Sequence, residues 1–157
     1  MANIKFLSTY MRLEDNDTRY VVVLDDDSIW WFAPGYPWQP STAEGLPLGY
    51  KIAHFKAYSR SPEDGTRYVA VLEDGTIWWF APNHIWEASS TQGLPAGYKI
   101  KHFEAYMKPE GTRYVVLLED NSLWWYTPGK PWQSSPMDGL PVTIADMTAT
   151  IPKPPTP

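Results

Sequence analysis

Two neighbouring stretches of the chain, residues 67–73 and 76–81, carry apolar side chains at most positions. They are separated by Asp74-Gly75, a dipeptide typical of the tight turn in a β-hairpin. A strand with one face in water alternates apolar and polar residues, whereas these two stretches are apolar on both faces. The pattern therefore predicts a hairpin that is covered on both sides.

The pairing across a two-residue turn sets the expected faces of this hairpin. It places Tyr68, Ala70 and Leu72 on one face with Ile77 and Trp79. The other face then holds Val69 and Val71 with Trp78 and Phe80. A β-propeller blade meets this requirement, because each blade packs between two neighbours.

The hairpin pattern occurs three times. Residues 18–24, 66–72 and 112–118 all begin Thr-Arg-Tyr, and each is followed by an acidic turn and a run containing Trp-Trp. Each copy ends with a further Trp and then Gly-Leu-Pro. The spacing is 48 residues from Arg19 to Arg67 and 46 from Arg67 to Arg113. A nearly fixed period of this size indicates a repeat architecture.

The repeats define one all-β domain over residues 1–151. We expect four strands in each repeat, which in the second copy are residues 52–58, 67–73, 76–81 and 85–89. A Pro-rich extended tail is expected to follow the domain. The boundaries are about 4–51, 52–99 and 100–141 for the repeats, 142–151 for a closing segment and 152–157 for the tail.

Three repeats of four strands fit two kinds of fold. We expect propeller-like blades. Three blades cannot close a ring, so the open ends must be covered, and symmetric self-association is the simplest way to cover them. Two chains would then give a six-bladed ring, and the chain is expected to be a homo-oligomer, with a dimer as the first guess. The alternative is a β-trefoil or β-prism with pseudo-threefold symmetry, which would be complete as a monomer.

Composition excludes several classes of function. The net charge is −5, with 13 Lys and Arg scattered along the chain, which argues against a nucleic-acid partner. No apolar run is long enough to span a membrane, and no stretch resembles a signal peptide. With no Cys as well, the sequence suggests a cytoplasmic protein, or one released by a non-classical route.

No arrangement typical of an enzyme is found. The acidic turns, such as Asp26-Asp27, are interpreted as turn chemistry, because three related turns would not converge on one substrate. His54 and His102 stand where the first repeat has Phe6, which indicates packed imidazoles. We therefore expect no catalytic residue, no cofactor and no metal site.

Aromatic residues give the strongest candidate site, because nine Trp and ten Tyr are present. Adjacent strand residues point to opposite faces, so the two Trp of each Trp-Trp pair cannot fill the same layer. Either one lies in the core and the other lines a groove between blades, or both are buried in the core. Aromatic rings stack on sugar rings, and charged or amide groups then orient the hydroxyls. The candidate carbohydrate-binding residues are Trp31, Trp79, Trp125, Trp38, Trp86, Trp132, Arg19, Arg67, Arg113, Gln39, Glu87 and Gln133.

One string of residues carries a resemblance to known proteins. Trp86, the segments 93–95, 99–100 and 114–116, and Asp120-Asn121-Ser122-Leu123-Trp124 resemble the blade pattern of tectonin- and tachylectin-type propeller lectins. They are also faintly similar to the regulator-of-chromosome-condensation repeat. The likeness spans residues 4–141 and implies a propeller fold and a lectin activity. The chain departs from these families, since their members carry five or more blades.

Two functions follow from these expectations. The first is a non-enzymatic, multivalent carbohydrate-binding protein with glycans as partners, whose repeated weak pockets gain affinity through avidity. The second is a protein-interaction or structural module, such as a toxin subunit, an inhibitor or a scaffold, that uses the same aromatic surface. A lectin should have several equivalent sites in each chain, whereas a protein partner would engage one asymmetric patch.

Overall fold

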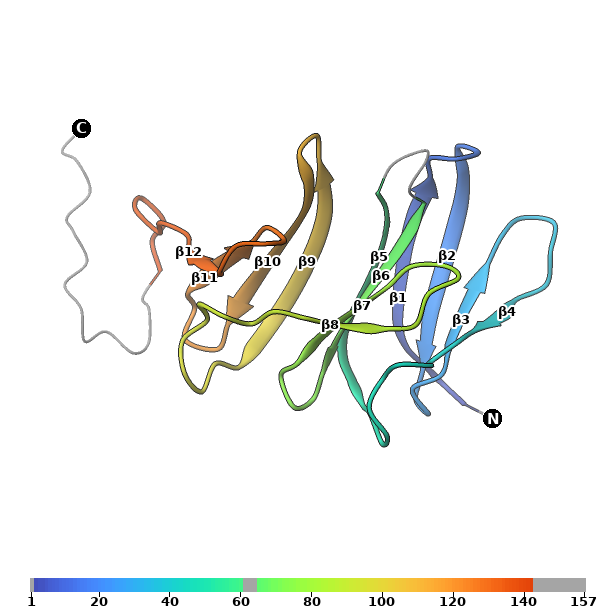
Figure 1. Cartoon of the computed structure of the whole chain (residues 1–157), viewed down its shortest axis with the longest axis horizontal. Helices are drawn as coiled ribbons and strands as arrows, with labels where there is room; N and C mark the ends of the chain where they lie inside the picture. Colours follow the sequence, from blue (N-terminus) through green and yellow to red (C-terminus); the bar gives the residue numbers. More distant parts are fainter. Residues whose placement is uncertain (1, 61–64, 143–157) are drawn as a thin grey trace.

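A computed structural model describes residues 2–60 and 65–142 of the protein (Figure 1), and these residues form twelve β-strands and no helix. The first repeat contains β1 (Ile4–Arg12), β2 (Asp17–Leu24), β3 (Ile29–Phe32) and β4 (Gln39–Ser41). The second contains β5 (Ile52–Ser59), β6 (Thr66–Leu72), β7 (Ile77–Phe80) and β8 (Glu87–Ser89). The third contains β9 (Ile100–Lys108), β10 (Gly111–Leu118), β11 (Leu123–Tyr126) and β12 (Gln133–Ser134).

Each repeat is a separate antiparallel sheet of four strands joined in sequence order. The first strands of successive repeats lie side by side, β1 against β5 and β5 against β9. The first and third sheets therefore stand at the two ends of a row (Figure 1). The expected all-β class and the three four-stranded repeats are confirmed.

The hairpin turn has three residues, not the predicted two. The Leu72 N–H donates to the Thr76 carbonyl, and the Gly75 N–H donates to the Leu72 carbonyl, each at 2.9 Å. Only the last residue of the loop has positive φ, which is 86° at Gly75, 66° at Asp27 and 70° at Asn121. Asp and Asn tolerate this single left-handed position, which explains why glycine occupies it in one repeat alone.

The third loop residue also reverses the predicted faces of the hairpin. Tyr68 pairs with Phe80 and Val69 pairs with Trp79, so the expected grouping of Tyr68 with Trp79 is wrong. Side chains alternate along a strand, and a shift of the register by one residue moves each side chain of one strand to the other face. The same register holds in the other two sheets, where Val21 pairs with Trp31 and Val115 with Trp125.

The expected burial of both faces is confirmed for the middle sheet. Every residue of β6 is buried. By contrast, β10 alternates between buried and half-buried residues, and Tyr20 in β2 is exposed although its equivalents Tyr68 and Tyr114 are buried. The two outer sheets therefore each keep one incompletely covered face.

The hydrophobic core lies between the sheets. One cluster joins the first and second repeats, and includes Val21 and Ile29 from one and Tyr68 and Trp86 from the other. A second cluster joins the second and third repeats in the same way. Each junction between repeats thus buries the side chains that a lone sheet would expose.

The predicted closing segment, residues 142–151, and the predicted tail, residues 152–157, lie outside the described residues except for Val142. Among the residues that are described, none belongs to a helix of the length and hydrophobicity needed to cross a membrane.

Candidate functional site

Each sheet has a front face and a back face, which we define by the tryptophan pair of its third strand. The front face carries Trp31, Trp79 or Trp125, and the back face carries Trp30, Trp78 or Trp124. Trp79 packs against the core shared with the third repeat, whereas Trp78 packs against the core shared with the first. The two tryptophans of each pair therefore point to opposite faces, and in the middle sheet both pack against a core.

Three of the predicted residue types share the front face. Gln39 pairs directly with Trp31 in the register of the first sheet, and Arg19 lies two residues before Val21, which also pairs with Trp31. Residues two apart on a strand and residues directly opposite on a pair of strands point to the same side. The equivalent sets are Trp79, Arg67 and Glu87 in the second sheet and Trp125, Arg113 and Gln133 in the third.

A cavity of about 590 Å³ opens where the front face of the first sheet meets the back face of the second. The first sheet contributes the side chains of Tyr10, Arg19 and Trp31 to its wall. The second repeat contributes the loop that contains Asn83 and His84. The cavity therefore joins an indole ring, a phenol, a guanidinium and polar loop residues.

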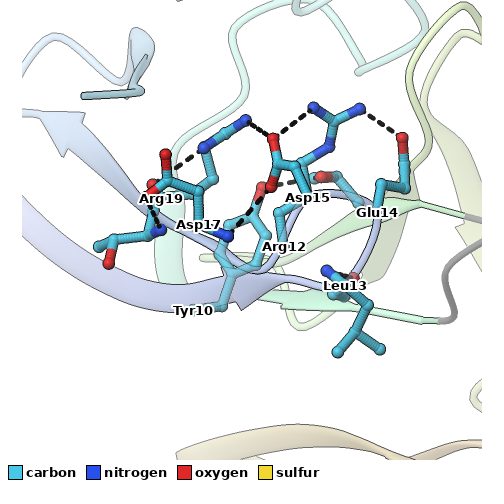
Figure 2. Close-up of polar contacts among 10 residues, drawn as sticks. Tyr10, Arg12, Leu13, Glu14, Asp15, Asp17 and Arg19 are labelled. Carbon is cyan, nitrogen blue, oxygen red and sulfur yellow. Dashed lines mark hydrogen bonds and ion pairs between the residues drawn. The ribbon is translucent and has the colours of Figure 1, made fainter. Parts of the chain in front are cut away.

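A network of charged residues fixes the arginine of this cavity (Figure 2). The Arg19 guanidinium donates to the Asp15 carboxylate at 2.7 Å and to the Thr18 carbonyl at 3.0 Å. Arg12 reaches the same carboxylate at 3.4 Å and also pairs with Glu14. Desolvation acts to raise the pKa of Asp15, but the bonds from the Asp17 N–H and from Arg19 hold that pKa below its usual value.

Tyr10 lies at the boundary between the two repeats that form the cavity. Its hydroxyl is 2.8 Å from the Thr66 hydroxyl of the second repeat. Burial raises the pKa of Tyr10, and the bond to Thr66 offsets part of this effect. Tyr10 therefore remains a neutral hydroxyl that can donate or accept a hydrogen bond at neutral pH.

The arginines of the other two front faces are also held in place. Arg67 is buried and donates to the Thr66 carbonyl at 3.0 Å. The Arg113 guanidinium lies over the Trp125 ring, 4.4 Å from its centroid, in a cation–π contact. The buried Arg113 Nε has no hydrogen-bond partner among the described residues. This front face therefore presents an indole covered by a guanidinium.

The remaining predicted tryptophans lie on the back faces. Tyr20, Phe32 and Trp38 form a ladder of rings, in which Tyr20 stacks on Phe32 at 5.5 Å between centroids and Trp38 is tilted against Phe32 at 5.1 Å. Equivalent ladders end at Trp86 and Trp132. Trp86 is 1% exposed and Trp132 is 3% exposed, whereas Trp38 is 42% exposed. Trp86 and Trp132 thus serve the packing between repeats, and Trp38 alone presents its ring to solvent.

The preceding repeat covers each of these buried tryptophans. The Trp86 backbone N–H donates to the Glu44 carbonyl at 2.8 Å, and its indole N–H donates to the Thr42 carbonyl at 2.9 Å. Trp132 makes the same two bonds to the carbonyls of Gln92 and Ser90, both at 2.8 Å. The repetition of these bonds shows that the two internal junctions are built alike.

The acidic turns have the structural role that the sequence predicts. The Asp74 carboxylate accepts hydrogen bonds from the Thr76 N–H at 2.9 Å and from its hydroxyl at 2.6 Å. The Thr76 hydroxyl oxygen in turn accepts the indole N–H of Trp78 at 2.9 Å. The other two turns repeat this arrangement through Asp26-Ser28-Trp30 and Asp120-Ser122-Trp124. Each of these carboxylates therefore accepts hydrogen bonds within its own turn.

The histidines of the first strands occupy different surroundings. His54 bonds to the Ile100 carbonyl at 3.1 Å, and partial burial lowers its pKa. His102 is exposed and bonds to the Glu104 carboxylate at 2.9 Å, so the prediction of a packed imidazole is wrong at this position. In the part of the chain that the structure describes, no three His, Asp or Glu side chains gather as a metal site would require.

Sequence reasoning missed the residues that the second repeat contributes to the cavity. Asn83 and His84 occupy a loop whose counterparts are Gly35-Tyr36 and Gly129-Lys130. This loop varies between repeats, whereas the Arg and Trp of the front faces do not, and a variable loop beside constant residues was the available signal.

No protein-family model and no curated protein sequence matches the chain. Among solved structures, the chain is similar to the BP39L lectin from Burkholderia pseudomallei, with 17% sequence identity and a TM-score of 0.44. The match covers 88% of this chain and 40% of that lectin, so the chain spans less than half of its length.

Proposed function

We propose that this protein is a non-enzymatic, multivalent carbohydrate-binding protein whose sites lie at the junctions between repeats. The observation that carries the proposal is the cavity at the first junction, where Trp31, Arg19 and Tyr10 converge. Its volume of about 590 Å³ is within the usual range of small-molecule sites, about 300–1,000 Å³.

The side chains of the cavity suit a sugar ring. An indole offers a flat apolar face for the C–H side of the ring, and the fixed donors of Arg19 suit its hydroxyl groups. The Asp15 carboxylate orients the guanidinium before a ligand arrives, which reduces the ordering cost of binding. Asn83 and His84 add polar groups from the other wall.

Repetition of the front face supplies the multivalency. The sets around Trp79 and Trp125 have the same register as the set around Trp31. Single shallow sites of this kind bind weakly, and several sites in one assembly raise the apparent affinity for a branched or clustered glycan. Self-association of the chain would increase the number of sites further.

A glycan array probed with labelled protein, followed by calorimetric titration of the best free glycan, tests the proposal. Trp31→Ala is expected to remove one binding equivalent from each chain, because it removes the stacking face of one cavity. Trp30→Ala is the matched control, since it removes a half-buried indole from the neighbouring position that does not line this cavity. Thermal unfolding of both variants confirms that they are folded.

Two results would contradict the proposal. One is the absence of glycan binding on the array and in solution. The other is a glycan titration in which Trp30→Ala and Trp31→Ala lose the same number of equivalents. Tight binding of a single protein partner to each chain, without any glycan binding, would instead support the protein-interaction alternative.

A further inference from the structure

The two internal junctions share a hydroxyl contact between consecutive repeats. Tyr10 of the first repeat meets Thr66 of the second at 2.8 Å, and Tyr58 of the second meets Thr112 of the third at 3.1 Å. Tyr58 is 7% exposed in its junction. The same tyrosine of the third repeat, Tyr106, is 45% exposed.

The junctions also share a close approach of a glycine to a tryptophan. A Cβ built on Gly45 would lie 2.4 Å from the Trp86 carbonyl oxygen, and one on Gly93 would lie 2.5 Å from that of Trp132. Only a glycine permits this contact. The equivalent Gly139 has no atom within 4 Å of the position that its Cβ would take.

Each end of the row of sheets therefore carries one half of a further junction. Among the described residues, no sheet packs against Tyr106 and the Gly139 turn of the third repeat. No described sheet packs against Trp38 and the exposed Thr18 of the first repeat either. Every element of the internal junction is present, with its two halves on opposite ends of the molecule.

Apolar side chains accompany these two halves. On the back face of the first sheet, Leu7, Met11 and Tyr20 are exposed, and Tyr20 is 39% exposed where Tyr68 is 4% exposed. On the front face of the third sheet, Val115 and Leu117 are only half-buried, although their equivalents in the middle sheet are buried. Both end faces therefore carry apolar side chains like those on one side of a hydrophobic core.

We propose that a second copy of this chain binds at both ends of the row of sheets. It would make the same contacts there that join consecutive repeats inside one chain. The third repeat of each copy would cover the first repeat of the other, with Gly139 against the partner's Trp38 and Tyr106 bonded to the partner's Thr18. A twofold axis makes both junctions at once and closes the row of six sheets.

The chain itself favours a second copy as the occupant. The junction requires a tyrosine on one side and a glycine turn over the tryptophan, and residues 143–157 contain neither Tyr nor Gly. Each end face is instead matched by the opposite end of the same chain. The contact continues an interface that already occurs twice inside each copy.

The docking has a consequence for the proposed sites, and this step rests on the proposed function. Arg113 and Trp125 lie on the front face of the third sheet, where no other sheet among the described residues supplies the second wall of a cavity. The partner's Gly35 and Tyr36 hold the positions that Asn83 and His84 have in the first junction. The third site would therefore be complete only in the dimer.

Light scattering on a sizing column tests the docking without any ligand. The wild-type chain is expected at twice its 18.0 kDa mass. Gly139→Asn and Leu7→Asp are expected to raise the dimer dissociation constant at least about tenfold and to shift the mass to that of one chain. Gly97→Asn is the matched control and should remain dimeric, because Gly97 also has positive φ and open space around it but lies away from both ends.

Three results would overturn the docking. A wild-type chain that is monomeric at tens of micromolar would do so, and so would a mass above that of two chains. A dimer that persists unchanged in both Gly139→Asn and Leu7→Asp would show that the copies meet elsewhere. Glycan binding by a strictly monomeric chain would preserve the proposed function, so the two proposals fail separately.

Discussion

The Arg19 guanidinium donates to the Asp15 carboxylate across 2.7 Å, at the edge of the cavity between the first two repeats. Asp15 itself does not line this cavity, whereas Arg19 does. The carboxylate therefore positions the arginine from outside the site.

Loss of this charge should weaken glycan binding more than it affects stability. We expect Asp15→Asn to lower the affinity of the first site by about threefold to tenfold, because the guanidinium loses a charge-assisted bond. The free energy of unfolding should change little, since the Asp15 side chain is 40% exposed and its ion pair is screened by solvent. Calorimetric titration and urea unfolding provide the two measurements.

Asp17→Asn serves as the control for this prediction. The Asp17 carboxylate accepts a hydrogen bond from the neighbouring Thr18 N–H and lies two residues from Asp15 (Figure 2). Its substitution should leave glycan affinity unchanged. Equal losses of affinity in both variants would show a general effect of charge and not a positioning role for Asp15.

The glycine beneath Trp86 should be intolerant of any side chain. Gly45→Ala is expected to lower the free energy of unfolding by about 2–4 kcal/mol, because it combines a clash with the Trp86 backbone and strain at a φ of +102°. Urea unfolding followed by tryptophan fluorescence measures the loss. Gly49→Ala, with a φ of +75° and no atom within 4 Å, should cost only about 1 kcal/mol. Similar losses in the two variants would indicate strain alone.

The acidic turns predict a loss of stability in acid. Hydrogen bonds from the Thr76 hydroxyl and N–H lower the pKa of Asp74, and those from Ser28 lower the pKa of Asp26. A lowered folded-state pKa means that stability is present above the unfolded-state value, near 3.8, and is lost as pH falls through the folded-state value. Urea unfolding midpoints should therefore decrease as the pH falls from about 5 to about 2.

The Asp26→Asn and Asp74→Asn double variant isolates this effect. An amide oxygen can still accept the turn hydrogen bonds, but it does not titrate in this range. The variant should show a shallower decrease of the unfolding midpoint over the same pH range. A decrease as steep as that of the wild type would assign the acid sensitivity to other carboxylates.

The strand order was predictable because its signals are local and repeated three times. The Thr-Arg-Tyr starts and the Trp-Trp runs each indicated a strand, and the acidic turns marked the hairpins between them. The faces of the hairpin were predicted wrongly, because the loop has three residues, ending at Gly75, and not two. The extra loop residue shifts the register of the two strands by one. The Asp-Gly dipeptide alone does not distinguish a two-residue loop from a three-residue loop.

The site was predictable on one face only. Trp31, Arg19 and Gln39 share the front face of the first sheet, and alternation along a strand was enough to suggest a groove-facing tryptophan. The burial of Trp86 and Trp132 depends on contacts with the preceding repeat more than 40 residues away. Contacts at such distances follow from how the sheets pack, which composition and spacing do not specify.

Binding stoichiometry tests the central claim most directly, namely that each repeat supplies one half of a site to a junction. Calorimetric titration of the wild-type protein with a small free glycan should give three sites per chain. Two of these would lie at the internal junctions and one at the junction with the partner copy. A single site per chain, or no binding at all, would contradict it.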